Sequence, residues 1–169
     1  MAFDINETGR AAKDAAFSLQ ALSSEEKNKA LCAVAEALIK NSALIISENA
    51  KDVAAAKEKG TSPALIDRLC LDEKRIGDMA VGVRQVAGLS DPIGELIDEW
   101  ERPNGLRIEK IKVPMGVIGI IYESRPNVTS DAFSLCFKTG NAVILRGGSD
   151  AINSNTAIVK IIREALESV

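Results

Sequence analysis

Apolar residues recur at helical spacing through the first ninety positions of the chain. The first such stretch carries them at Ala11, Ala12, Ala15, Ala16, Leu19 and Leu22. The pattern breaks at Ser23-Ser24, where Ser23 and Glu26 have the spacing of a capping box, and it resumes on one face over residues 31–38. We therefore predict a first helix that ends near residue 22 and a second helix that follows Ser23.

Start and stop signals predict three more helices. One should begin near residues 41–42 and stop at Gly60, and a second should follow Ser62-Pro63, an N-cap residue with proline at the first helical position. A third should run from Asp72 to Gly88. This antiparallel, alanine-rich region is predicted to be a scaffold without chemistry of its own.

A hairpin is predicted next. Residues 96–102 and 106–113 flank Pro103-Asn104-Gly105, and Asn-Gly between two alternating runs is a strong hairpin signal. The apolar positions of the second run are Leu106, Ile108, Ile111 and Val113. The break in their alternation between residues 108 and 111 allows a bulge or a twist.

After Pro114 the pattern changes to strand, helix, strand and helix. Residues 117–122 form an almost continuous apolar run, which predicts a strand buried on both faces, and residues 142–145 form a second one. Helices are predicted near 127–139, ending at Gly140, and near 153–168. Two successive βα units indicate a parallel sheet with right-handed crossovers. Because two parallel strands do not make a stable buried sheet, we expect the chain to be truncated before its next strand.

Composition and charge exclude several classes of protein. The 169 residues are 46% hydrophobic and 27% charged, with a net charge of −3, as expected for one soluble globular domain. Lys and Arg are scattered among Asp and Glu, so no nucleic-acid partner is expected. No apolar run is long enough for a membrane span, and the N-terminus MAFDINETGR lacks the features of a signal peptide.

The chain contains no histidine and three cysteines. Cys32, Cys70 and Cys136 are far apart, lie in apolar or helical surroundings and lack metal-ligand spacing, so we interpret them as buried thiols of a cytoplasmic protein and predict no metal. Cys136 lies in the amphipathic segment FSLCFK, which favours a packing role over a nucleophile.

Two loops leave the carboxyl ends of the predicted parallel strands, where open α/β sheets bind ligands. Residues 123–127 (ESRPN) follow the first strand and residues 146–150 (RGGSD) follow the second. Both carry arginine, small residues and helix-capping residues, which suit an anion. The alternative is a pair of ordinary βα turns with solvated arginines. A G-x-G-x-x-G fingerprint is absent.

The segment MGVIGIIYESRPNVTSDAFSLCFKTGNAVILRGGSDAINSN, residues 115–155, is similar to the γ-glutamyl phosphate reductases, also called glutamate-5-semialdehyde dehydrogenases. YESRPN and NAVILRGGS carry the resemblance, which extends over essentially the whole chain. The wider aldehyde dehydrogenase superfamily shares the looser order of helices, hairpin, G-V-x-G strand and G-N-x-V-x-x-[KR] strand.

The resemblance implies an α/β fold with three regions. Residues 1–95 would be the helical portion of a Rossmann-like cofactor domain, residues 96–113 a hairpin for homo-oligomerisation, and residues 114–169 the first βαβα of the nucleotide-binding sheet. The implied reaction is the NADPH-dependent reduction of L-glutamyl 5-phosphate to L-glutamate 5-semialdehyde in proline biosynthesis. The catalytic domain with its nucleophilic cysteine would follow residue 169, so this chain alone would be inactive.

The resemblance also implies roles for six residues. Arg146 stands where aldehyde dehydrogenases carry a lysine that holds the adenosine ribose, and Ser149 stands where NAD-using relatives often have glutamate. Together with Gly147 and Gly148 they imply an NADP(H) site. Independently of the resemblance, the residue types predict that Ser149 or Asp150 caps the next helix.

In the loop after the first strand, Asn127 is interpreted as the oxyanion donor and Arg125 as the ligand of phosphate or substrate, with Glu123 available to pair with Arg125. Which of Arg125 and Asn127 faces the reacting carbonyl stays open. The alternatives for the whole protein are another aldehyde or acyl dehydrogenase of the same superfamily, or a non-catalytic nucleotide-binding or interaction module.

Overall fold

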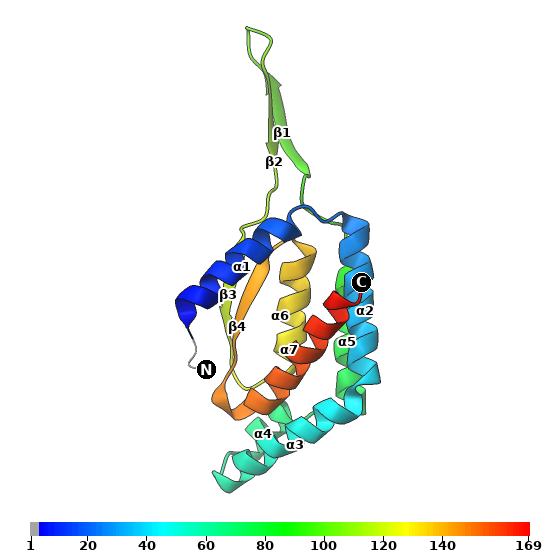
Figure 1. The fold of residues 1–169 in the computed structure, drawn as a ribbon, viewed down its shortest axis with the longest axis vertical. Helices are drawn as coiled ribbons and strands as arrows, with labels where there is room; N and C mark the ends of the chain where they lie inside the picture. Colours follow the sequence, from blue (N-terminus) through cyan, green and yellow to red (C-terminus); the bar gives the residue numbers. More distant parts are fainter. Residues whose placement is uncertain (1–3) are drawn as a thin grey trace.

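The computed structural model describes residues 4–169, which form a helical body with a hairpin projecting from one end (Figure 1). Residues 1–3, at the start of the predicted helical region and of the MAFDINETGR segment, lie outside the described residues. The helices are α1 (Ile5–Leu19), α2 (Ser24–Lys40), α3 (Ser42–Glu58), α4 (Pro63–Leu69), α5 (Glu73–Gly88), α6 (Asn127–Lys138) and α7 (Ile152–Glu167), with a 3₁₀ turn η1 (Ser149–Ala151). The strands are β1 (Leu96–Glu101), β2 (Arg107–Ile111), β3 (Val117–Ile121) and β4 (Ala142–Arg146).

The helix boundaries follow local chemistry. The hydroxyl of Ser23 accepts from the Glu26 N–H, and the Glu26 carboxylate accepts from the Ser23 N–H at 2.7 Å, so the predicted capping box is confirmed. The Asp72 carboxylate likewise accepts from the backbone N–H of Arg75 at 2.7 Å. Gly60 after α3 and Gly140 after α6 have φ of +71° and +68°, in the left-handed region where glycine ends helices at little cost.

The core lies where α2 packs between α5 and α7. Its fully buried side chains include Leu31, Val34 and Leu38 of α2, Ile76 and Val83 of α5, and Ile158 and Ile161 of α7. These residues lie three, four or seven positions apart, so each helix turns one apolar stripe inward. Within residues 4–169, no single helix is both long and apolar enough to cross a membrane; only α2 and α3 taken together, bent by 67°, reach that length and composition.

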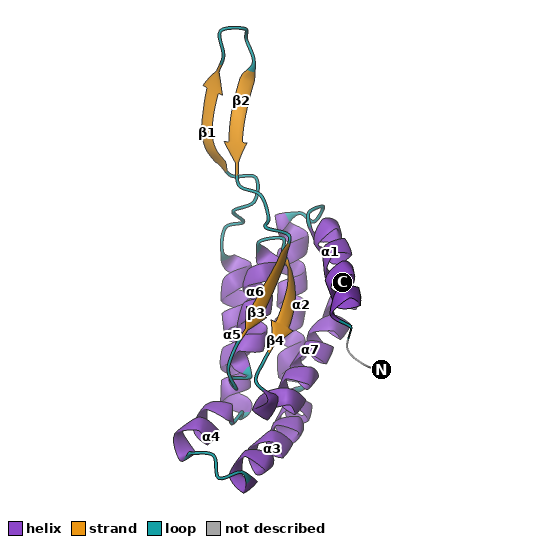
Figure 2. Cartoon of the chain, turned by 90° about the vertical axis from the view of Figure 1, so that its left-hand side faces the viewer, coloured by secondary structure: helices purple, strands orange, loops and turns teal. Residues whose placement is uncertain are grey.

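Strands β3 and β4 pair in parallel, with Val117 opposite Ala142 and Ile121 opposite Arg146. The predicted βαβα order is therefore confirmed, and Figure 2 shows the two strands lying alongside the helices. The prediction that β3 is buried on both faces is wrong: Val117, Gly119 and Ile121 share one exposed face, and Ile121 is 83% exposed. Helices α1 and α6 pack mainly against β4, and among the residues that the structure describes no third strand covers β3.

Strands β1 and β2 form the predicted antiparallel hairpin, with Trp100 opposite Ile108. Gly105 in its turn has φ +80°, which explains the glycine after Asn104. The irregularity in pairing lies on β1, between Leu96 and Asp98, and not on β2, where the broken alternation between residues 108 and 111 allows a bulge or a twist. All of β1 is exposed, because the hairpin extends away from the body (Figure 2).

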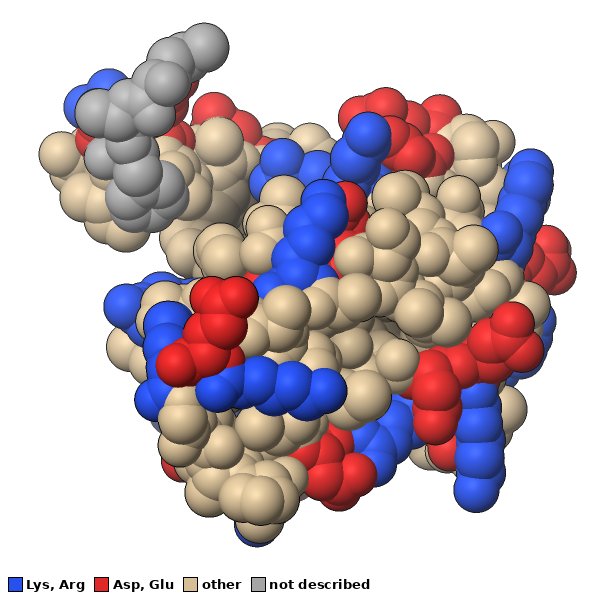
Figure 3. Space-filling view, turned by 90° about the horizontal axis from the view of Figure 1, so that it is seen from below, with Lys and Arg blue, Asp and Glu red and all other residues tan. Residues whose placement is uncertain are grey.

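The surface charges are mixed. On the face seen from below the body, Lys and Arg side chains are interspersed with Asp and Glu side chains and form no continuous basic stripe (Figure 3). The picture agrees with the small net charge of −3.

Candidate functional site

The two predicted ligand-binding loops lie next to each other at the carboxyl ends of β3 and β4. The backbone N–H of Tyr122 donates to the carbonyl of Arg146 at 3.1 Å and extends the parallel ladder by one residue. Ser124 then approaches Gly148 closely, so the loops 123–127 and 146–150 contact one another. The structure therefore brings together the two segments that the sequence pattern singled out.

Gly147 and Gly148 are required by this close contact. A Cβ on Gly147 would lie 2.3 Å from Nδ2 of Asn155, and a Cβ on Gly148 would lie 2.6 Å from Oγ of Ser124. Asn155 is held in place because its side-chain carbonyl accepts from the Thr129 hydroxyl at 3.0 Å. The two glycines thus allow the loops to pack, a reason that the sequence analysis did not give for them.

Arg146 is exposed at the end of β4, as expected. Its guanidinium makes one hydrogen bond, from Nη1 to the carbonyl of Gly147 at 3.2 Å. The other N–H donors of Arg146 have no partner within residues 4–169. Ser149 begins the 3₁₀ turn η1 that separates Arg146 from α7.

The expectation that Ser149 or Asp150 caps α7 is wrong. Asp52 of α3 provides the cap instead: its carboxylate accepts from the backbone N–H groups of Asn153 and Ser154, at 3.2 and 2.8 Å. It also accepts from the side chains of both residues, at 2.7 and 2.6 Å. Because η1 inserts a turn before α7, Asp150 lies away from the helix end and forms an ion pair with Lys59 at 3.0 Å.

Asn49, one turn before Asp52 on α3, belongs to the same buried network. Its amide donates to the carbonyl of Leu69 at 2.8 Å and to the hydroxyl of Ser154 at 3.0 Å, and its carbonyl accepts from the N–H of Leu71 at 2.8 Å. Asn49 and Asp52 are 2% and 3% exposed. Sequence reasoning missed both; the available signal was a pair of short polar residues, three apart, on an otherwise apolar helix face.

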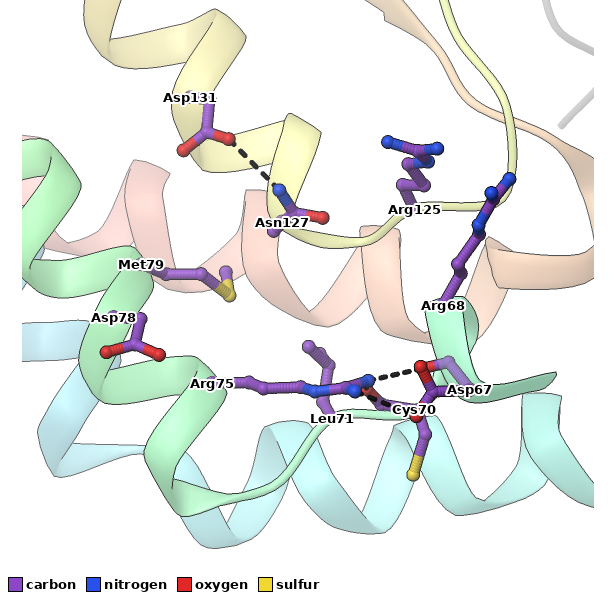
Figure 4. Close-up of a pocket in the computed structure, with 10 residues that line it drawn as sticks. All are labelled: Asp67, Arg68, Cys70, Leu71, Arg75, Asp78, Met79, Arg125, Asn127 and Asp131. Carbon is purple, nitrogen blue, oxygen red and sulfur yellow. Dashed lines mark hydrogen bonds and ion pairs between the residues drawn. The ribbon is translucent and has the colours of Figure 1, made fainter. Parts of the chain in front are cut away.

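A cavity of about 410 Å³ lies between α4, α5 and the start of α6, and we call it the first cavity (Figure 4). It contains both residues predicted from the loop after β3, Arg125 and Asn127. Its charged walls are formed by three aspartates and three arginines: Asp67, Asp78, Asp131, Arg68, Arg75 and Arg125. Sequence reasoning missed the contribution of α4 and α5, because nothing in their spacing marks a ligand.

The charges of Arg75 and Asp67 neutralise each other, whereas the charge of Asp131 is not neutralised within the described residues. Arg75 donates to the Asp67 carboxylate at 2.9 Å and to the carbonyl of Cys70 at 2.7 Å. Asp131 accepts from the Asn127 amide at 3.1 Å, but burial outweighs this hydrogen bond and raises the pKa of Asp131 above its ordinary value. Among the described residues, no lysine or arginine forms an ion pair with the Asp131 carboxylate, whose one hydrogen bond is the one from Asn127.

A second cavity, of about 320 Å³, lies beside the first, between α3, α4 and the loops after β3 and β4. Arg68 and Arg125 line both cavities. Glu123 also lines the second cavity, and the expected ion pair with Arg125 does not form; the two residues share only a backbone hydrogen bond of 2.8 Å. Arg68 and Arg125 therefore lie on the wall that the first and second cavities share.

The expectation of three buried thiols holds for one cysteine. Cys136 is buried on α6, and burial raises the pKa of its thiol, as expected for a packing residue. Cys32 and Cys70 are exposed, because Cys32 falls on the outer face of α2 and Cys70 follows the last residue of α4. The sulfur of Cys70 points away from Asn127 and Arg125 in Figure 4.

Sequence comparison identifies close relatives of the whole chain. No protein-family model matches it. A gamma-glutamyl phosphate reductase from Geobacillus sp. (strain WCH70) is 62% identical over 154 residues, which are 91% of this chain and 37% of that protein. One from Clostridium botulinum (strain Eklund 17B / Type B) is 58% identical over 159 residues. The chain is homologous to a portion of gamma-glutamyl phosphate reductase.

Solved structures of gamma-glutamyl phosphate reductase have the same fold. The enzyme from Thermotoga maritima superposes with a TM-score of 0.96 at 47% identity, over 99% of this chain and 40% of that one. The enzyme from Saccharomyces cerevisiae gives a TM-score of 0.90 at 32% identity, over 96% of this chain and 41% of that one. The chain thus spans about two fifths of the length of these relatives.

More distant structures share the fold alone. A benzaldehyde dehydrogenase from Corynebacterium glutamicum superposes with a TM-score of 0.73 at 20% identity. The resemblance inferred from YESRPN and NAVILRGGS is therefore confirmed, and so is the α/β fold of a portion of an aldehyde dehydrogenase.

Proposed function

We propose that these 169 residues belong to a longer cytoplasmic enzyme that reduces L-glutamyl 5-phosphate to L-glutamate 5-semialdehyde with NADPH and releases phosphate, in proline biosynthesis. The observation that supports this most strongly is the 62% identity to a gamma-glutamyl phosphate reductase over 91% of the chain. The polar first cavity, next to the loops at the carboxyl ends of β3 and β4, supports the same reaction.

Arg125 and Asn127 are proposed to act on the acyl phosphate. Both line the first cavity, and Arg125 lies on the wall that this cavity shares with the second one. A guanidinium binds a phosphate through paired, charge-assisted hydrogen bonds, so Arg125 would stabilise the leaving group. The Asn127 amide donates one N–H to Asp131, which leaves its other N–H for the oxyanion that forms at the reacting carbonyl.

Arg146, Gly147, Gly148 and Ser149 are proposed to hold the adenosine end of NADPH, which supplies the hydride. The free N–H donors of Arg146 fit a 2′-phosphate. Ser149 at the start of η1 brings no negative charge, whereas a glutamate there would repel the phosphate.

The nucleophilic cysteine of the reaction is proposed to lie outside these residues. A thiolate must be exposed and activated to attack an acyl phosphate, whereas the Cys136 thiol is buried and its pKa is raised. Cys32 lies on α2 and lines neither cavity. Cys70 lines the first cavity, but its sulfur points away from the loop after β3 (Figure 4). The isolated 169-residue polypeptide would therefore show no turnover.

The hairpin is proposed to join subunits of a homo-oligomer. Apolar side chains remain exposed along it, including Leu96 at 48%, Ile97 at 52% and Trp100 at 41%. An isolated two-stranded hairpin is only marginally stable in water, so packing on another subunit would stabilise it.

Genetic complementation tests the proposed function. The gene of the complete enzyme that carries these residues should restore growth without proline to a bacterial strain whose gamma-glutamyl phosphate reductase has been deleted. Growth only with added proline, despite normal expression of the protein, would refute the proposal.

A further inference from the structure

The first cavity has opposite charges at its two sides. In Figure 4 the carboxylates of Asp78 and Asp131 lie on one side, and the guanidinium groups of Arg68 and Arg125 lie on the other, with Asn127 between them. The Asp67–Arg75 ion pair contributes to the remaining wall. The volume, about 410 Å³, lies within the range of roughly 300–1,000 Å³ that is usual for small-molecule sites.

We propose that this cavity recognises the free amino group of an α-amino-acid substrate, with Asp78 and Asp131 binding its ammonium group while Arg68 joins Arg125 on the anionic group at the far end. The inference rests on the proposed function, which it extends by assigning the residues that distinguish an amino-acid acyl phosphate from one without an amino group.

The acidic side has the properties of an ammonium site. Asp131 on α6 faces α5 closely, since a Cβ on Gly82 would lie 3.8 Å from its Oδ1. It is partly buried, and among the described residues no lysine or arginine pairs with it or with Asp78. A partly buried carboxylate without a cation is unfavourable, and a bound ammonium group would offset that cost.

The basic side has two arginines whose guanidinium groups are free to bind. Neither Arg68 nor Arg125 makes a side-chain hydrogen bond or an ion pair to any of residues 4–169, which the structure describes. Arg68 comes from α4 and Arg125 from the loop after β3, so an anion between them would connect the helical region to the sheet. Asn127 between the two sides then lies where the carbonyl of a short, zwitterionic substrate would pass.

Binding of L-glutamate and glutarate to the complete enzyme provides the test, because the two molecules differ only in the amino group. By calorimetry, the wild-type enzyme should bind L-glutamate about tenfold more tightly, the value of one charge-assisted hydrogen bond. Asp78→Asn and Asp131→Asn should each remove most of that preference without weakening the binding of glutarate, which has no ammonium group to lose a partner. The control variant Asp14→Asn, on the exposed face of α1, should keep it.

Arg68→Gln should have the complementary effect and weaken both ligands equally. A wild-type enzyme without preference for L-glutamate, or Asp78→Asn and Asp131→Asn variants that retain it, would overturn the proposal. Circular dichroism verifies that each variant is folded, and Asp78 is exposed, so its substitution tests the site even if Asp131→Asn unfolds the enzyme.

Kinetics separate this proposal from the proposed function. With L-glutamate 5-semialdehyde, the Asp78→Asn and Asp131→Asn variants should raise KM about tenfold and change kcat little. Absence of turnover by the wild-type enzyme together with an intact preference for L-glutamate would refute the proposed reaction and uphold the amino-acid site. Normal turnover with unchanged KM in both variants would refute the site and uphold the reaction.

Discussion

The carboxylate of Asp52 on α3 accepts hydrogen bonds from both the backbone N–H and the hydroxyl of Ser154, at 2.8 and 2.6 Å, in the first turn of α7. A negative charge at the start of a helix compensates the unsatisfied N–H groups and the positive end of the helix dipole. Residues distant in sequence thus fix the start of α7, and with it the position of the preceding loop 146–150.

Asp52→Ala should destabilise the protein by about 3 kcal/mol, because it leaves the buried donors of Ser154 and the partly buried donors of Asn153 without an acceptor. Urea unfolding followed by circular dichroism measures the change. Lys51→Ala, on the same helix, removes only an exposed ion pair with Glu48 and should change stability by less than about 0.5 kcal/mol. Equal effects of the two substitutions would contradict the assigned role of Asp52.

Gly147→Ala should destabilise the protein by about 1–3 kcal/mol, because the new methyl group would overlap Nδ2 of the anchored Asn155 and press on the Tyr122 ring. Thermal unfolding measures the loss. Gly77→Ala is the matched control, since its Cβ meets no atom within 4 Å in the interior of α5, and it should stabilise by about 0.5–1 kcal/mol. A neutral Gly147→Ala would mean that the loops are not packed as described.

Asp91 makes the base of the hairpin sensitive to acid. Burial alone would raise the pKa of Asp91, but hydrogen bonds from the buried Lys27 ammonium and from the Ile93 N–H outweigh burial and lower it. Because the folded pKa lies below the unfolded value of about 3.9, the pair stabilises the fold above that pH and the contribution is lost as the pH falls through the lower value.

Asp91→Asn should therefore cost about 3 kcal/mol at pH 7, where it leaves the Lys27 charge buried without its partner. The difference from the wild type should begin to shrink below about pH 4, where Asp91 of the unfolded chain takes up a proton, and should vanish below the lowered pKa of the folded state. Urea unfolding of both proteins at about five pH values between pH 3 and pH 7 measures this difference in stability. A difference that stays constant over that range would rule out the ion pair as its cause.

Local chemistry made much of the fold predictable. The Ser23 capping box, the Asn104-Gly105 turn and the Gly140 stop each depend on residues within a few positions, so the sequence contains the whole cause. The burial of β3 was predicted wrongly because an apolar run such as residues 117–121 indicates that both faces of the strand favour burial, but it does not indicate whether neighbouring elements cover both faces. The burial of Cys32 and Cys70 was predicted wrongly for a similar reason, because exposure depends on tertiary packing: Cys32 lies on the face of α2 that is turned away from the core, and Cys70 follows the end of α4.

The candidate site was predictable only in its loops. Arg125, Asn127 and Arg146 follow strands, and the rule that ligands bind at the carboxyl ends of parallel strands singles them out. Asp78 and Arg68 reach the same cavity from α5 and α4, and that meeting depends on tertiary packing. Likewise, Asp52 caps α7 where a cap from Ser149 or Asp150 was expected, because η1 shifts the start of α7 to Ile152.

Cofactor preference should depend on Arg146. In the complete enzyme, Arg146→Ala should reduce kcat/KM with NADPH by about 1.5–3 kcal/mol more than with NADH, through loss of charge-assisted hydrogen bonds to the 2′-phosphate. Ser149→Glu should act in the same direction by placing like charge beside that phosphate. Equal losses with both cofactors would instead assign Arg146 to the fold or to the shared region of the nucleotide.

The reaction itself is tested most directly in the oxidative direction, with the purified complete enzyme, L-glutamate 5-semialdehyde and NADP⁺. NADPH formation, followed by absorbance, is expected to require inorganic phosphate, because phosphate must release the acyl group from the enzyme as L-glutamyl 5-phosphate. Cys136→Ser and Cys70→Ser should leave kcat unchanged, since neither thiol attacks the substrate. No NADPH formation, or formation at the same rate without phosphate, would contradict the proposed reaction.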